Sequence, residues 1–233
     1  MYLAGNSHPE IAFAVHQCAH FSHCPKQTHS VAVKHLARYL KGILDSKDGM
    51  ILKPTTDLSL DCYVDADFAG LWNYEDDQDP ICVCSRTGYV MTMGGCPIHW
   101  TSKLQGNIIL LRTEAEFVAL AQAMRELIPM RRSFDDMLVA FNLRQDNSPT
   151  VKSIIFEDNN GAISTATTPK MTPCTKHIAV KYHFVKQLFH PSESTKSLFQ
   201  LVKIDTLSQK ADVLTKGLGS KSFHHIRKLL CGY

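Results

Sequence analysis

The sequence predicts an α/β fold in which one mixed sheet is flanked by helices and preceded by a small helical appendage. Three strand-like segments come first, and two more strands then alternate with helical segments. Strands joined by short loops form a meander, whereas strands separated by helices extend the sheet. The 233 residues are 44% hydrophobic and 20% charged, as in ordinary globular proteins. We therefore expect a helical appendage at residues 1–53 and a larger domain at residues 54–233.

The appendage is expected to contain two helices. Apolar residues recur at helical spacing over residues 9–22 and 29–44. In the second segment Val33, Leu36 and Leu40 share one stripe, and basic residues occupy another. This pattern is typical of an amphipathic helix with one buried face.

The larger domain begins with a predicted strand at residues 58–68. Its residues alternate strictly, with Val64 and Ala66 on an apolar face and Asp65 and Asp67 on a polar one. Alternation with a period of two is the signature of a strand that buries one face. The polar face of this strand is acidic at its far end.

Two further strands and a long helix follow. The strands are expected at residues 87–93 and 97–102, joined by a pair of glycines that favours a hairpin. Helical spacing of apolar residues then begins at Thr113. Pro129 is expected to kink or divide this helix, because proline lacks an N–H group and clashes with the preceding turn.

The rest of the larger domain alternates between strands and helices. Residues 151–156 are rich in β-branched side chains and predict a strand, which the turn Asp158-Asn159-Asn160-Gly161 connects to a small helix. The remaining predicted elements are a helix at residues 176–189, a strand at 197–204, and helices at 209–215 and 221–230.

Four carboxylates lie at the ends of these predicted elements. Asp65 ends the first strand, and Glu116 lies in the first turn of the long helix. Asp158 follows the later strand, and Asp212 lies near the start of a late helix. A single α/β sheet can bring these places to one edge, where the four charges would repel unless cations neutralised them. Oxygen ligands favour Mg²⁺ or Mn²⁺, and two such ions are a recurrent apparatus for phosphodiester hydrolysis.

Each carboxylate also has a purely structural interpretation. Asp65 fits a solvent-facing position on its strand, although aspartate is depleted in strands. Glu116 completes a capping box that begins at Thr113. Asp158 fits an N-cap position, and Asp212 fits the positive end of a helix.

Charge is distributed unevenly along the chain. Residues 1–53 contain 6 basic and 3 acidic side chains, residues 54–169 contain 8 and 16, and residues 170–228 contain 11 and 3. An acidic middle followed by a basic tail favours an enzyme that gathers carboxylates around metal and binds a polyanion. Two differently charged solvated faces would give the same pattern without any function.

Three classes of protein are not expected from this sequence: membrane-spanning proteins, secreted proteins and polymerases. No apolar run approaches the ~20 residues that a membrane span needs, and the N-terminus lacks the layout of a signal peptide. The segment Tyr74-Glu75-Asp76-Asp77 matches the Y-x-D-D signature of a reverse-transcriptase polymerase site. Only 73 residues precede it, and it lies in a polar loop instead of a hairpin tip, so we do not expect polymerase activity.

Several segments resemble the ribonuclease H region of copia-type retrotransposon polyproteins. They are Tyr63-Val64-Asp65-Ala66-Asp67-Phe68-Ala69-Gly70, Ser85-Arg86-Thr87-Gly88-Tyr89-Val90, Trp100-Thr101-Ser102-Lys103, Thr113-Glu114-Ala115-Glu116-Phe117-Val118-Ala119-Leu120, Thr175-Lys176-His177-Ile178 and Ala211-Asp212-Val213-Leu214-Thr215-Lys216. Residues 1–53 resemble the tail of the preceding reverse transcriptase, with Tyr2-Leu3-Ala4, His8-Pro9-Glu10-Ile11-Ala12-Phe13-Ala14-Val15 and Arg38-Tyr39-Leu40-Lys41-Gly42. The resemblance covers nearly the whole chain.

The resemblance implies a ribonuclease H-like fold with a mixed five-stranded sheet flanked by helices. It also implies an enzyme that cleaves the RNA strand of RNA:DNA hybrids with two Mg²⁺ or Mn²⁺ ions. Asp65, Glu116, Asp158 and Asp212 match the family's metal ligands, and the family motif favours Asp65 over Asp67. The implied partners are an RNA:DNA hybrid and the remaining polyprotein, including reverse transcriptase. The expected location is the cytoplasm or virus-like particles, without secretion. The alternative is an inactive remnant that at most binds nucleic acid.

The candidate nucleic-acid contacts are Lys176, His177, His183 and Lys216. His177 and His183 lie six residues apart, and therefore not on one helix face, so they also have a structural interpretation. The chain departs from the family at Phe68, where tryptophan is usual, and at Arg112, which could compete for the charge of Glu116. No histidine lies between residues 191 and 223, so the mobile histidine of some ribonucleases H has no candidate there.

Overall fold

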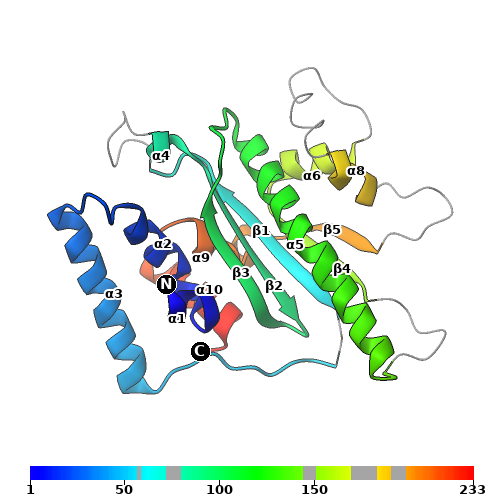
Figure 1. Cartoon of the computed structure of the whole chain (residues 1–233), viewed down its shortest axis with the longest axis horizontal. Coiled ribbons are helices and arrows are strands. Elements are labelled where there is room, and N and C mark those ends of the chain that lie inside the picture. Colours follow the sequence, from blue (N-terminus) through cyan, green and yellow to red (C-terminus); the bar gives the residue numbers. More distant parts are fainter. Residues whose placement is uncertain (57–58, 72–79, 144–150, 169–182, 190–197) are drawn as a thin grey trace.

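The computed structural model describes residues 1–56, 59–71, 80–143, 151–168, 183–189 and 198–233. Within these ranges the centre of the molecule is one five-stranded sheet in the order β3-β2-β1-β4-β5 (Figure 1). Its strands are β1 (Leu60–Asp67), β2 (Arg86–Met93), β3 (Cys96–Leu104), β4 (Ser153–Glu157) and β5 (Phe199–Lys203).

The sheet is mixed, as the sequence predicts. β1, β2 and β3 form an antiparallel meander. β4 then pairs parallel to β1, and β5 pairs parallel to β4. β1 is therefore paired on both sides, and the expected mixed five-stranded sheet with flanking helices is confirmed.

Helices cover both faces of this sheet (Figure 1). The described helices are α1 (Tyr2–Asn6), α2 (Ala12–His20), α3 (Gln27–Ser46), α4 (Pro80–Val83), α5 (Arg112–Ala140), α6 (Asn160–Thr167), α8 (His183–Phe189), α9 (Asp212–Thr215) and α10 (Ser220–Cys231), with 3-10 turns at Pro9–Ile11 and Thr206–Ser208. α5, α6 and α8 share one core with alternate residues of β1, whereas α9 and α10 lie in a second core that includes Val90 of β2.

The long helix α5 is continuous through Pro129, so this residue does not divide it, and the alternative expectation of a kink stays a prediction. Met124 and Leu127 lie on the sheet-facing side of α5 and are fully buried. Pro129 lies on the exposed side, as does Arg125, whose carbonyl loses its helical partner. Water can satisfy that carbonyl, and packing of the opposite side holds the helix together.

The N-terminal helices are attached to the sheet by polar contacts as well as by their shared core. The indole Nε1 of Trp100 on β3 donates to the carbonyl of Ala4 at 2.6 Å. Arg86 on β2 donates to Oε1 of Gln17 at 2.7 Å. The short α1 was not expected from the sequence, and the division at residue 53 stays a prediction.

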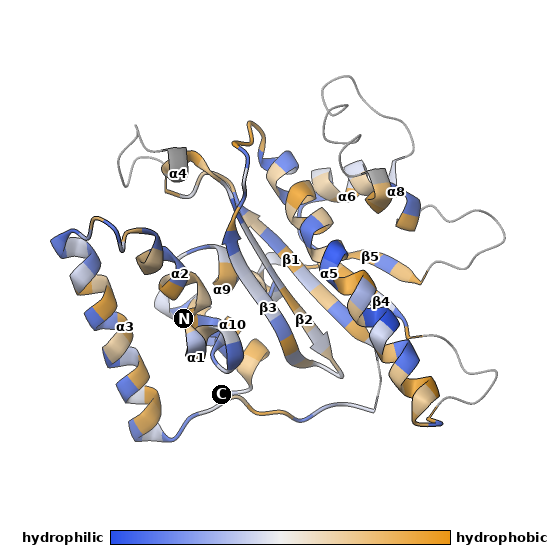
Figure 2. Ribbon diagram, viewed as in Figure 1, coloured by the Kyte–Doolittle hydropathy of each residue, from blue (hydrophilic) through white to orange (hydrophobic). Residues whose placement is uncertain are grey.

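Helix α3 is more exposed than the other N-terminal helices. Figure 2 shows hydrophilic and hydrophobic residues alternating along it, in keeping with its predicted amphipathic character. Only Ile43 of this helix is buried, while Leu36, Tyr39 and Leu40 pack partly against the second core. None of the described helices is both long enough and apolar enough to cross a membrane.

Candidate metal centre

Asp65 occupies the central position of an acidic cluster at the end of β1. Its side chain is completely buried, and its backbone lies opposite Gly88 of β2. A Cβ atom at Gly88 would come within 2.5 Å of Cγ2 of Thr215. The glycine therefore allows α9 to pack closely against the sheet beside Asp65, and the Thr215 hydroxyl donates to Asp65 Oδ2.

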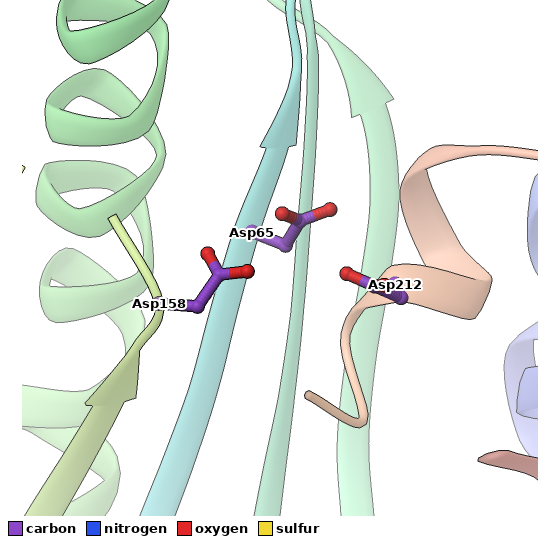
Figure 3. Close-up of side chains that lie close together, drawn as sticks. All are labelled: Asp65, Asp158 and Asp212. Atoms are coloured by element: carbon purple, nitrogen blue, oxygen red, sulfur yellow. The ribbon is translucent and has the colours of Figure 1, made fainter. Parts of the chain in front are cut away.

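Two further aspartates approach Asp65 from other elements. Asp158 follows β4, and Asp212 is the first residue of α9. Figure 3 shows the three carboxylates pointing toward one another, and each offers an oxygen within 4.8 Å of the others. The Thr206 hydroxyl donates to Asp158 Oδ2 at 2.8 Å and fixes its orientation.

Lys216 neutralises part of this group. Its Nζ lies 2.9 Å from Asp212 Oδ1 and 3.4 Å from Asp65 Oδ2. Burial alone would lower the pKa of Lys216, but the carboxylates of Asp65 and Asp212 outweigh burial and raise it. The lysine is thus held as a cation between two acids, and its predicted contact with nucleic acid stays a prediction.

A second group of three carboxylates adjoins the first. Glu116, Glu157 and Asp158 also offer oxygens that lie within 4.8 Å of one another, so Asp158 belongs to both groups. Glu116 and Glu157 are both fully buried. The backbone N–H of Ala66 donates to Glu116 Oε2 at 2.6 Å, while Arg112 Nε lies 3.7 Å from Oε1.

Burial and mutual repulsion shift the pKa values of these acids. Burial, followed by the neighbouring charges of Asp65 and Asp158, raises the pKa of Glu116 to about 8. Burial, followed by the charge of Asp65, raises the pKa of Asp212 to about 7. The pKa of Glu157 is raised well above its usual range, first by burial and then by Glu116. Acids in this arrangement need protons or cations to relieve the cost of their charge.

The donor set fits divalent cations that prefer oxygen ligands. Among the described residues, five buried carboxylate oxygens have no hydrogen-bond partner: Asp65 Oδ1, Glu116 Oε1, Glu157 Oε2, Asp158 Oδ1 and Asp212 Oδ1, the last of which forms an ion pair with Lys216. Unpaired buried acceptors are rare in folded proteins because each carries a desolvation cost. Hard cations such as Mg²⁺ and Mn²⁺ would pair these oxygens.

The structure brings the four sequence-predicted ligands together and decides between some of their alternative interpretations. Glu116 is not a capping residue, because α5 begins at Arg112 with Leu111 as its N-cap and without a side-chain cap. The N-cap of α6 is Asn159, whose Oδ1 accepts from two backbone N–H groups, so Asp158 is not the cap. Asp212 does lie in the first turn of α9, as its structural interpretation expected.

The sequence analysis missed Glu157 as a member of the cluster. Burial in β4 alternates, with Ser153, Ile155 and Glu157 on the buried face. An acid at an inward-facing strand position was the available signal. Lys176 and His177 lie outside the described residues, as does the Y-x-D-D segment at residues 74–77, whereas His183 begins α8.

Comparisons with known proteins place the chain among transposon proteins. It is 32% identical over 217 residues to a retrovirus-related Pol polyprotein from transposon RE1 of Arabidopsis thaliana, covering 93% of the chain and 13% of that protein. It is also 32% identical over 230 residues to the Pol polyprotein from transposon TNT 1-94 of Nicotiana tabacum, covering 99% of the chain and 15% of that protein.

No protein-family model matches the chain. A solved structure does align with it. The structure of LC11-RNase H1, isolated from compost by a metagenomic approach, aligns at 18% identity with a TM-score of 0.44. This alignment covers 68% of the chain and 93% of that protein. Over almost all of its residues, the chain is similar to a short stretch of these retrovirus-related transposon Pol polyproteins, and it spans 13% and 15% of their lengths.

Proposed function

We propose that this chain is the ribonuclease H of a copia-type retrotransposon, which hydrolyses the RNA strand of RNA:DNA hybrids with two Mg²⁺ or Mn²⁺ ions. The observation that carries the proposal is the convergence of buried carboxylates from β1, α5, the end of β4 and α9. Their unpartnered oxygens support cation binding. Homology to Pol polyproteins supports a substrate formed during reverse transcription.

Asp65, Glu116, Asp158 and Asp212 would hold the ions. When bound, such ions supply a water nucleophile of lowered pKa and stabilise the leaving 3′-oxygen. The protein's own contribution is orientation. Pairing of β1 on both sides fixes the position of Asp65, the Thr215 hydroxyl holds one of its oxygens, and the N–H of Ala66 holds Glu116.

The surroundings of the cluster suit a polyanionic duplex. The Arg112 side chain is 64% exposed beside Glu116, so it offers positive charge to a phosphate at the edge of the site. A hybrid would be recognised through its minor groove and 2′-hydroxyl groups without sequence preference. We further propose that the chain acts beside reverse transcriptase within the polyprotein, in the cytoplasm or in virus-like particles.

Cleavage of a labelled RNA:DNA hybrid tests the proposal. The purified chain should cut the RNA strand in Mg²⁺ or Mn²⁺, and Asp158→Asn should reduce the rate roughly 10³-fold, because several kcal/mol of transition-state stabilisation depend on the ions. Asp136→Asn is the matched control, since Asp136 is exposed on α5 away from the cluster. Undiminished cutting by Asp158→Asn would reject the assignment. Salt-sensitive hybrid binding without cleavage in either metal would favour the inactive remnant.

A further inference from the structure

Glu157 is an unexpected acid on the inner side of the sheet. It is the last residue of β4 and is completely buried. The backbone N–H of Asn159 donates to its Oε1 at 3.1 Å, while its Oε2 has no hydrogen-bond partner among the described residues. A buried carboxylate with one oxygen that lacks a hydrogen-bond partner carries a cost in free energy unless a proton or a cation compensates its charge.

The surroundings of Glu157 provide no basic side chain to compensate that charge within the described residues. The charged groups that influence it are Glu116, Asp65 and Asp158, which are all acidic. On α5, Arg112 is mostly exposed and lies 3.7 Å from Glu116. Glu116 also has a buried oxygen without a hydrogen-bond partner in the described part of the chain.

These oxygens without hydrogen-bond partners belong to three residues that can ligate one ion together. Glu116, Glu157 and Asp158 offer oxygens within 4.8 Å of one another, and each of the three has one oxygen without a hydrogen-bond partner in the described ranges. Carboxylate oxygens with this spacing suit a hard divalent cation, which neutralises several charges at once. A single shared proton would leave the remaining negative charges buried.

We propose that Glu157 is a fifth metal-binding carboxylate, and that Glu116, Glu157 and Asp158 form one divalent-cation site while Asp65, Asp158 and Asp212 form the other. This inference rests on the proposed cation binding but not on hybrid cleavage. Asp158 is the ligand that both sites share. Glu157 thereby strengthens the site that Glu116 alone would leave with few ligands from the protein.

Counting bound Mn²⁺ tests the inference without measuring activity. The full chain is titrated with Mn²⁺, and free Mn²⁺ is followed by its electron paramagnetic resonance signal. The unaltered protein should bind two ions. Glu157→Gln should lose one of them or bind it about 100-fold more weakly, because it replaces a charged ligand by a neutral group of the same shape.

Three variants keep the result interpretable. Asp212→Asn should weaken the other ion, and Glu126→Gln, an exposed change on α5, should weaken neither. Glu157→Asp keeps the charge but shortens the side chain, and it should also weaken the same ion if Glu157→Gln fails to fold. Circular dichroism confirms folding of each variant.

The possible failures are distinguishable. Two ions bound with unchanged affinity in both Glu157 variants would overturn the inference and leave the proposed function intact. No bound ion in the unaltered protein at millimolar Mn²⁺ would overturn the inference together with the proposed cation dependence. Loss of one ion in Glu157→Gln alongside intact hybrid cleavage would support the ligand assignment but contradict the proposed two-ion hydrolysis.

Discussion

The two sides of the acidic cluster differ in how their negative charge is neutralised. On the lysine side, Asp65 and Asp212 share the ammonium group of Lys216. On the glutamate side, Glu116 and Glu157 are fully buried, and the ion pair found there within the described residues joins the exposed Arg112 to Glu116. The difference indicates that the protein itself neutralises part of the charge on the lysine side, whereas the glutamate side depends on protons or bound cations.

Removing Lys216 should have the largest effect on the metal-free protein. Lys216→Met leaves Asp65 and Asp212 buried together without a counter-charge. We expect a loss of about 3 kcal/mol in the free energy of unfolding, at the lower end for breaking a buried pair, because 29% of the lysine side chain is exposed. Urea unfolding in EDTA at neutral pH measures it.

Lys221→Met is the matched control, because Lys221 is exposed on α10 and should change stability little. Adding Mg²⁺ should restore most of the stability that Lys216→Met loses, since a bound cation replaces the missing charge. An unchanged unfolding curve for Lys216→Met in EDTA would show that the two sides are not neutralised differently.

Replacing Glu116 should stabilise the metal-free protein, but only at high pH. The pKa of Glu116 is raised from 4.5 to about 8, so its contribution favours folding below pH 4.5 and is lost as pH rises through 8. Glu116→Gln removes the carboxylate whose ionisation lowers stability at high pH, and it keeps an acceptor for the N–H of Ala66. We expect a gain of about 1–2 kcal/mol at pH 9 and little change at pH 5, measured by thermal unfolding in EDTA.

The same exchange at an exposed position serves as the reference for this pH dependence. Glu126→Gln on α5 should shift the melting temperature equally at both pH values. A destabilised Glu116→Gln protein at pH 9 would mean that the Glu116 carboxylate is already compensated without a cation, contrary to the contrast between the two sides.

Removing Arg112 should have the smallest effect. Its side chain is 64% exposed, and its Nε lies 3.7 Å from Glu116, so water and salt screen most of the interaction. Arg112→Ala should therefore cost no more than about 0.5 kcal/mol in chemical unfolding at physiological salt. A cost of several times that value would identify Arg112 as the counter-charge of the glutamate side.

The sequence by itself determined much of the fold, because hydrophobic periodicity is a local property. Strict alternation around Val64 and Ala66 predicted β1, and the spacing after Thr113 predicted α5. The same periodicity placed Asp65 at a strand end. It could not decide whether Pro129 kinks or divides α5, because the effect of a proline depends on which side of the helix is buried, and only packing shows that.

The tertiary structure decided which acids act together. Glu116 fits a capping box in sequence, yet its hydrogen-bond donor is the N–H of Ala66, which lies 50 residues earlier in the chain. Glu157 was overlooked because its neighbours along β4 do not reveal that Glu116 faces it. Lys216 is predicted to contact nucleic acid, and folding also places it against Asp65, from which it is far removed in sequence. Such contacts join distant segments, so only the packing of α5 and α9 against the sheet could reveal how the charges balance.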